Sequence, residues 1–127
     1  MLKLILVALL FSTSALARDT GQWEGSDPAV REWYQTLQRP DLPSLSCCGE
    51  ADAYYCDNIS VRQGKTYCKI TDDRPDEPLG RPHLALGTEF EIPNEKLKYD
   101  AGNPTGHAIL FVTGNGVVMC FVQGTGI

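Results

Sequence analysis

The chain lacks both a cluster of basic residues and an apolar run long enough to cross a membrane. Asp and Glu outnumber Lys and Arg by 16 to 11, which gives a formal net charge of −5. Nucleic acids and anionic membrane surfaces need clustered positive charge, so neither is expected as a partner. The longest apolar run, Leu4 to Phe11, has about half of the roughly 20 residues that span a bilayer. We therefore expect no membrane span in the mature protein.

The first seventeen residues have the pattern of an export signal. Lys3 supplies the positive start, Leu4 to Phe11 the apolar segment, and Ala15-Leu16-Ala17 a small-residue cleavage site. We predict cleavage after Ala17 and a periplasmic or secreted location. Residues 18–26 contain two glycines and no periodic pattern, so they are predicted to be a flexible leader. Residues 27–127 are predicted to form a single β-rich domain stapled by disulfides.

One helix is expected at the start of this domain. Asp27 can accept hydrogen bonds from the first free backbone N–H groups, and Pro28 sits where a missing N–H costs nothing. Pro40 ends the pattern, which predicts a helix over about residues 27–38. Its apolar stripe, spaced at i, i+3, i+4 and i+7, consists of Val30, Trp33, Tyr34 and Leu37.

The rest of the domain favours strands. The pattern predicts a small antiparallel barrel or a curved sheet of about five strands. A turn is expected at residues 63–65, and the proline-rich, charged segment 72–82 is expected to be a long exposed loop. The predicted strands are Tyr54–Val61, Thr66–Thr71, Thr88–Ile92, His107–Thr113 and Val117–Gln123.

The last two predicted strands are apolar on both faces. Residues Ile109 to Val112 contain no polar side chain, and residues Val117 to Val122 contain none either. A sheet that is apolar on both faces must have each face buried against another part of the protein. We expect one face to meet the main core and the other to meet the Trp33 stripe of the helix.

The chain has five cysteines, an odd number, so at most two bridges can form within one molecule. Neighbouring Cys47 and Cys48 point to opposite faces of an extended segment, which favours different fates for them. If Cys56 and Cys68 face each other across a hairpin, their bridge closes a loop of about 13 residues and contributes roughly 3 kcal/mol. A bridge from Cys47 or Cys48 to Cys120 closes about 73 residues and contributes roughly 4 kcal/mol.

Thiol chemistry has little support in the sequence. There is no C-x-x-C motif, and no Lys or Arg flanks Cys47-Cys48 to lower a thiol pKa. Structural bridging is therefore favoured over redox catalysis.

No metal or cofactor is expected. His83 and His107 lie beside prolines and turns, without a zinc-binding spacing. The acidic residues between Asp72 and Glu77 match no calcium loop. The residues kept as functional candidates are His107, Asn103, Asp72 and Asp76.

Three segments resemble a family of small exported proteobacterial proteins of uncharacterised function. They read SCCGEADAY, IPNEKLKYDAGNPTGH and CFVQGTG, beginning at Ser46, Ile92 and Cys120. The resemblance implies that Cys47-Cys48 and Cys120 belong to the shared pattern, whereas Cys56 and Cys68 are additions. It favours a Cys56–Cys68 bridge and a bridge from the double cysteine to Cys120. The residues leave open which of Cys47 and Cys48 makes that second bridge; we place Cys48 in it and take Cys47 as the candidate free thiol.

The favoured function is a non-enzymatic interaction or structural domain that binds a protein or another envelope component. This preference rests on the scarcity of catalytic motifs. One alternative is a thiol-dependent or hydrolytic envelope enzyme that uses Cys47 or Cys48 with His107. Another is an inhibitor of a secreted hydrolase.

Overall fold

The computed structural model describes residues 27–77 and 80–124, so the predicted signal and leader lie outside the described residues. The described part is mainly β, with seven strands, one α-helix and one short 3-10 helix. The elements are α1 Pro28–Thr36, β1 Asp52–Tyr55, β2 Asn58–Arg62, β3 Lys65–Lys69, β4 Glu89–Ile92, η1 Asn94–Lys96, β5 Leu97–Tyr99, β6 Ile109–Val112 and β7 Val118–Gln123.

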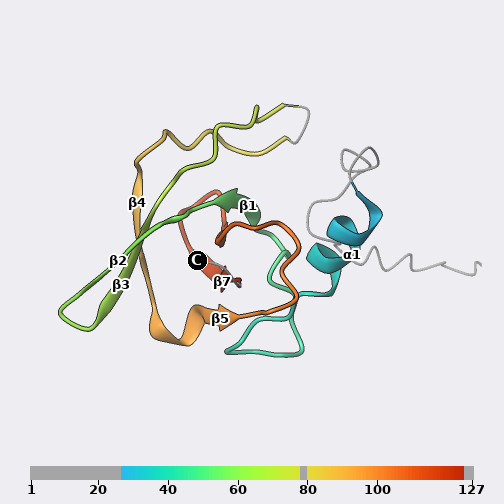
Figure 1. Cartoon of the computed structure of the whole chain (residues 1–127), viewed down its shortest axis with the longest axis horizontal. Coiled ribbons are helices and arrows are strands. Elements are labelled where there is room, and N and C mark those ends of the chain that lie inside the picture. The colour runs from blue at the N-terminus through green and yellow to red at the C-terminus, as the bar shows by residue number, and fades with distance from the viewer. Residues whose placement is uncertain (1–26, 78–79, 125–127) are drawn as a thin grey trace, which may run out of the picture.

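The strands form two sheets. One has four strands in the order β1-β6-β7-β5, and the other has three in the order β2-β3-β4 (Figure 1). All pairs are antiparallel except β5 with β7, which run parallel. These pairings do not close on themselves, so the barrel stays a prediction.

The expected count of about five strands is too low for two reasons. The predicted strand Tyr54–Val61 is two strands in different sheets, because the chain leaves the first sheet at Cys56-Asp57. The short strand β5 was also missed, since only three residues pair with β7. Three residues are too few to show a period in the sequence.

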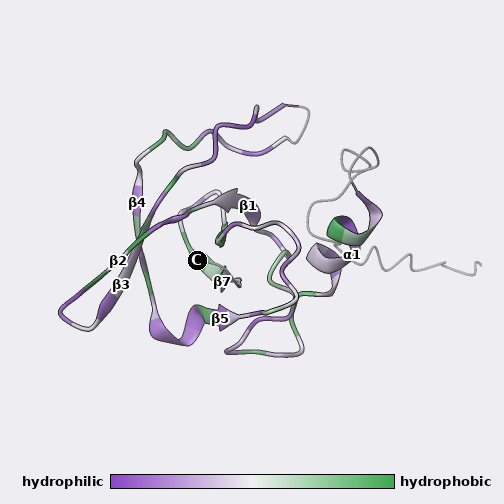
Figure 2. Ribbon diagram, in the orientation of Figure 1, coloured by the Kyte–Doolittle hydropathy of each residue, from purple (hydrophilic) through white to green (hydrophobic). Residues whose placement is uncertain are grey.

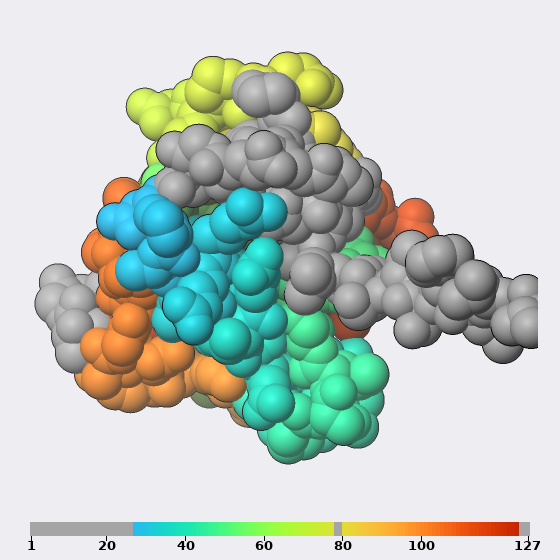
Figure 3. All heavy atoms as spheres, turned by 90° about the vertical axis from the view of Figure 1, so that its right-hand side faces the viewer, coloured from blue at the N-terminus to red at the C-terminus, as the bar shows by residue number. Residues whose placement is uncertain are grey.

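Helix α1 begins where the sequence predicts. The Asp27 side chain accepts a hydrogen bond from the Ala29 backbone N–H at 2.9 Å. The helix ends at Thr36, two residues before the predicted end, because Leu37 is already extended. The Trp33 indole N–H donates to Asp100 at 3.0 Å, and the helix lies beside the segment around residue 100 in Figure 3. This bond ties α1 to the chain that follows β5.

The β6-β7 hairpin has the two covers that its apolar faces require. One face packs with the second sheet, and the other packs with the segment that includes α1, as predicted. Figure 2 shows hydrophobic colour along β7 at the centre of the molecule. The buried residues of the first cluster include Tyr54, Cys56, Cys68, Ile70, Ile92, Leu110 and Phe121. Those of the second are Leu37, Cys47, Cys48, Ala51, Ile109, Phe111, Cys120 and Val122, with Trp33 and Tyr34 packed against them.

An irregular register between β6 and β7 changes one side-chain assignment. Phe111 is opposite Cys120, but the next pair is Val112 with Val118. Met119 is therefore an extra residue in β7, as in a β-bulge. Simple alternation places Val118 on the face of Cys120, whereas the structure places it in the first cluster.

The β2-β3 hairpin projects on the side of the molecule away from α1 (Figure 1). Its two-residue turn has Gln63 at φ 52° and Gly64 at φ 76°. Positive φ at both positions is the geometry of a type I′ turn, which suits the twist of paired strands. The prediction of a turn here is confirmed.

The segment 72–82 departs from its prediction. Its described residues contain no helix or strand, as expected, but Asp72 and Arg81 are each only 6% exposed. Asp73 and Glu77 are exposed, as expected, but Asp72, Arg74, Asp76 and Arg81 form an internal network. That network belongs to the candidate site.

Candidate functional site

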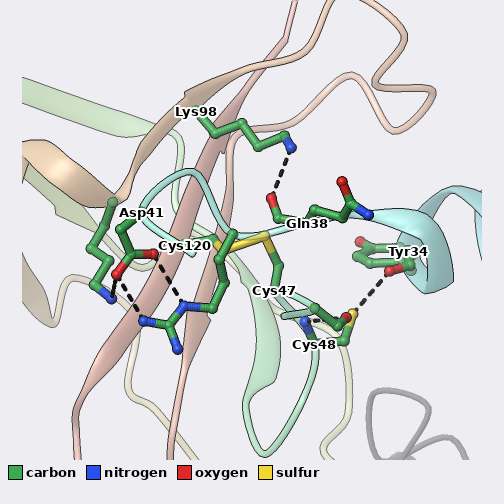
Figure 4. The surroundings of a disulfide bond; sticks show 10 residues. Tyr34, Gln38, Asp41, Cys47, Cys48, Lys98 and Cys120 are labelled. Atoms are coloured by element: carbon green, nitrogen blue, oxygen red, sulfur yellow. Dashed lines mark hydrogen bonds and ion pairs between the residues drawn. A yellow bond between two sulfur atoms is a disulfide. The ribbon is translucent and has the colours of Figure 1, made fainter. Parts of the chain in front are cut away.

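The two disulfides account for four of the five cysteines. Cys56 is bonded to Cys68, which confirms the favoured pairing, and Cys47 is bonded to Cys120. The assignment of Cys48 to the second bridge, with Cys47 free, is therefore wrong. Figure 4 shows the reason: the Cys47 side chain points to β7, whereas that of Cys48 points to the carbonyl of Tyr34. The neighbours have opposite directions, as an extended pair should.

Cys48 is in neither disulfide, and its thiol is enclosed. The residue is 3% exposed, and its Sγ donates to the Tyr34 carbonyl oxygen at 3.1 Å. Its surroundings are the second cluster, whose members are mainly apolar. A thiol buried in apolar surroundings is inert, because the thiolate form is disfavoured there. This geometry does not support an exchange reaction at Cys48.

A polar network lies along the outer edge of β1. The Asp72 carboxylate accepts from the Tyr55 backbone N–H at 3.1 Å, and Arg81 donates to the Ala53 carbonyl at 2.9 Å. The Thr71 N–H donates to the Tyr55 carbonyl at 3.0 Å. An edge strand otherwise leaves such groups open to another chain. The loop after β3 therefore takes the place of a neighbouring strand.

Asp72 and Arg81 form a buried ion pair at 2.7 Å, with side-chain exposures of 0% and 3%. Arg74 adds a second ion pair to the same carboxylate at 2.6 Å. In total the two oxygens of Asp72 accept five hydrogen bonds. Burial by itself raises the pKa of Asp72, but the bonds from Arg74, Arg81 and the backbone outweigh it and hold the pKa well below its usual range.

Three side chains form a stack above this edge. Arg74 lies over the Tyr55 ring at 3.8 Å from its centroid, and the His107 ring stacks on Tyr55 at 3.8 Å with an interplanar angle of 7°. Two groups this close cannot share one face of a ring. Tyr55 is therefore sandwiched between Arg74 and His107, an arrangement that combines cation–π and aromatic contacts.

His107 is oriented by a carboxylate. Its Nδ1 lies 2.7 Å from Asp57 Oδ2, and Asp57 Oδ1 accepts from the Ala108 N–H at 2.7 Å. The Thr71 hydroxyl donates to the same Asp57 carboxylate at 3.0 Å. A histidine held in this way resembles the base half of a catalytic triad. In the part of the chain that the structure describes, no serine or thiol is bonded to the ring of His107.

Asn103 has a structural position beside His107. Its side-chain N–H donates to the His107 carbonyl at 2.8 Å, and its oxygen accepts from the N–H and the hydroxyl of Thr105. These bonds close the turn that leads into β6. Both the nitrogen and the oxygen of the amide therefore form hydrogen bonds within the turn.

Asp76 completes the network at the far end of the loop. It accepts from Arg81 at 3.0 Å and lies 2.8 Å from Nδ1 of the exposed His83. Its contact with His83, followed by that with Arg81, lowers the pKa of Asp76. Among residues 27–77 and 80–124, no group of three or more His, Cys, Asp or Glu side chains could hold a metal ion.

The structure thus brings together all four candidate residues. His107, Asp72 and Asp76 are joined through Tyr55, Arg74 and Arg81, and Asn103 is bonded to the His107 backbone. Sequence reasoning missed Asp57, Arg74 and Arg81 as members. One available signal was that Arg74 and Arg81 lie within nine residues of Asp72 in the same segment, so opposite charges could pair there.

No protein-family model, curated protein or solved structure matches this chain. Within the described residues, no helix is both long and apolar enough to cross a membrane. The two disulfides indicate an oxidising, extracytoplasmic environment.

Proposed function

We propose that this chain is an exported, non-enzymatic interaction domain of the periplasm or the extracellular medium. The proposal retains the predicted signal over residues 1–17 and the resemblance to small exported proteobacterial proteins. It treats the two disulfides and the loop network as means of holding a small binding scaffold rigid. Its partner is a protein or another component of the envelope.

The observation that carries the proposal is how fully the Asp72 carboxylate is engaged within the fold. Asp72 accepts five hydrogen bonds from Tyr55, Arg74 and Arg81. Such a carboxylate has no role left as a general base, because its lone pairs already point at internal donors. The network bonds the outer edge of β1 in place of a neighbouring strand. This is a structural role and not a catalytic one.

The state of the thiols supports the same choice. An enzyme that uses Cys47 would need that sulfur reduced, but it is bonded to Cys120. An enzyme that uses Cys48 would need access to a residue that is 3% exposed. By contrast, several large apolar side chains remain available for contacts. These are Leu42, Leu45, Val61, Leu86, Tyr99 and Val117, with exposures from 47% to 68%.

The proposal can be tested by site-specific photocrosslinking in the native envelope. A photoreactive residue is placed at Leu86 or Val117, and adducts are resolved by mass after irradiation of intact cells. We expect a discrete adduct at one or both positions. The same adduct should form in the Cys48→Ala background, because the thiol has no part in binding.

Two outcomes would contradict the proposal. Absence of any adduct at both positions, with the protein present in the envelope, would remove the interaction role. An adduct that requires the Cys48 thiol would favour the thiol-dependent enzyme instead.

A further inference from the structure

The fold treats two of its sheet edges in opposite ways. The outer edge of β1 is covered by Thr71, Asp72 and Arg81, which bond its backbone groups. Strand β2 is also an edge strand, since it pairs only with β3 in its sheet. Natural sheets commonly cover or disrupt an edge that would otherwise pair with another chain. An edge that is left uncovered is available for pairing with another chain.

The backbone of β2 has hydrogen-bonding groups directed away from its sheet. A two-residue turn makes Arg62 and Lys65 the closing hydrogen-bonded pair of the hairpin. Backbone direction alternates along an antiparallel strand, so Ile59 and Val61 present their N–H and C=O groups to the open side. Throughout residues 27–77 and 80–124, no hydrogen bond to these groups is formed.

The side chains of β2 give a second reason to expect a neighbouring strand, because an exposed apolar residue would be buried by it. Val61 is 68% exposed, although its row in the sheet continues through buried Thr66 and Ile92. In the next row, Ile59 packs against the first core cluster. A strand laid along β2 would extend this apolar face and cover Val61. Figure 1 shows the β2-β3 hairpin projecting from the molecule on the side away from α1.

We propose that a second copy of this chain pairs with β2 through its own β2, antiparallel and centred on Ser60. In this register Ile59 faces the second copy's Val61, and Asn58 faces the second copy's Arg62. The Ile59–Val61 pairs are the hydrogen-bonded ones, whereas Ser60 meets Ser60 in a non-hydrogen-bonded pair. The contact has twofold symmetry and closes on itself, giving one six-stranded sheet. This goes beyond the proposed interaction role, because it adds self-association through a surface other than Leu86 and Val117.

Charge and pattern favour β2 over the other open edge of the same sheet. Apolar Ile59 and Val61 flank Ser60 symmetrically, and no like charges become opposite each other. The same operation on β4 would place Glu91 opposite Glu91, or Glu89 opposite Glu91, at either centre of symmetry. Like charges directly opposite one another destabilise a strand pair. A five-residue strand pair is small, so we expect reversible association.

The register is tested by engineered disulfides in the purified, oxidised protein with Cys48→Ala. Ser60→Cys should give a covalent dimer under mild oxidation, because a non-hydrogen-bonded pair brings the two Cβ atoms close. Arg62→Cys alone should remain monomeric, since its two copies are four residues out of register. A mixture of Asn58→Cys and Arg62→Cys should give the mixed dimer.

Sedimentation without engineered cysteines provides an independent readout. We expect the wild type to shift toward dimer as concentration rises, and Val61→Lys to weaken that shift about tenfold or more, because each contact loses two buried valines. Leu45→Lys is the matched control, since Leu45 is 48% exposed outside β2. It should behave as wild type.

The inference is overturned if Ser60→Cys and Arg62→Cys crosslink equally, or if the wild type stays monomeric and Ser60→Cys gives no dimer. It is also overturned if Ser60→Cys in cells joins a different protein and not a second copy. That last outcome would leave the interaction role intact. Loss of all adducts at Leu86 and Val117 in the envelope would instead remove that role while leaving self-pairing in the purified protein measurable.

Discussion

At the scale of single residues, Asp72 is the side chain on which most of the loop depends. It pairs with Arg74 and Arg81 and also accepts from the β1 backbone. A buried pair contributes little relative to an apolar replacement, but removing one member leaves the other charge uncompensated. Arg81 is 3% exposed at its side chain and would keep its ion pair with the partly exposed Asp76, but that pair does not replace the buried charge of Asp72.

We therefore predict that Asp72→Asn lowers the free energy of unfolding by about 3–5 kcal/mol at neutral pH. The measurement is urea denaturation followed by fluorescence. Asp73→Asn is the control, because Asp73 is the exposed neighbour in the same loop, and it should change stability by less than about 0.5 kcal/mol. Equal effects of the two substitutions would contradict the role given to Asp72.

The same residue predicts how stability depends on pH. The pKa of Asp72 is lower in the folded protein than the usual value of about 3.9 that the unfolded chain has. The unfolded state therefore binds the proton first as the pH falls, and the contribution of Asp72, full at neutral pH, is lost progressively below about pH 5. The stability difference between wild type and Asp72→Asn should narrow over that range. A constant difference down to pH 3 would contradict this explanation.

Cys48 gives a second prediction at this scale. Its burial and its bond to the Tyr34 carbonyl should make the thiol unreactive in the folded protein. We expect a thiol-specific alkylating reagent to add nothing under native conditions and one group after unfolding without reductant. Cys48→Ala should add none in either state. Rapid labelling of the native protein would show that the thiol is accessible.

At the scale of elements, the β2-β3 turn contains Gln63 at a position whose backbone conformation glutamine does not favour. Gln63 has φ 52°, a left-handed conformation that Asn adopts at lower cost. We predict that Gln63→Asn, which creates an Asn-Gly turn, raises the free energy of unfolding by about 0.5 kcal/mol. Gly64→Ala should lower the free energy of unfolding by about 1 kcal/mol, because Gly64 has φ 76°, a conformation that is costly for alanine. A Cβ at this position would meet no other atoms, so backbone strain is the only expected cost. Thermal unfolding of both variants measures the two signs.

Elements whose signals are local were predictable from the sequence. The Asp27 cap, the two-residue turn and strand β4 follow from one short stretch each, and the two apolar faces of β6 and β7 correctly required two covers. The break between β1 and β2 was not predictable in this way. Both sides of Cys56-Asp57 favour strand, and only tertiary pairing assigns them to different sheets.

The site was less predictable than the fold, because its contacts join residues far apart in the chain. Asp57 and His107 are 50 positions apart, and Arg81 reaches Ala53 across 28. Charge in a proline-broken segment is ordinarily solvated, so the sequence favoured an exposed loop. The sequence also could not show which of Cys47 and Cys48 bonds to Cys120, since that depends on which face of the segment meets β7.

At the scale of the whole molecule, the two disulfides hold different kinds of contact. Cys56–Cys68 joins residues 12 apart, whereas Cys47–Cys120 joins residues 73 apart and ties the segment after α1 to β7. All four residues are fully buried, so truncating either pair to alanine removes similar packing. The difference between the pairs should then reflect the length of the closed loop.

We predict that Cys47→Ala with Cys120→Ala lowers the free energy of unfolding by about 4 kcal/mol, and that Cys56→Ala with Cys68→Ala lowers it by about 3 kcal/mol. Denaturant titration of the two double variants provides the comparison. A larger loss from the short loop would show that local strain or packing dominates over chain entropy.

The most direct test of the whole account is mass analysis of the unreduced protein isolated from its native cell envelope, followed by peptide mapping. We predict a chain that begins at Arg18, with Cys47 joined to Cys120, Cys56 joined to Cys68, and Cys48 as the single thiol alkylated after unfolding. An uncleaved chain with five alkylated thiols would contradict it.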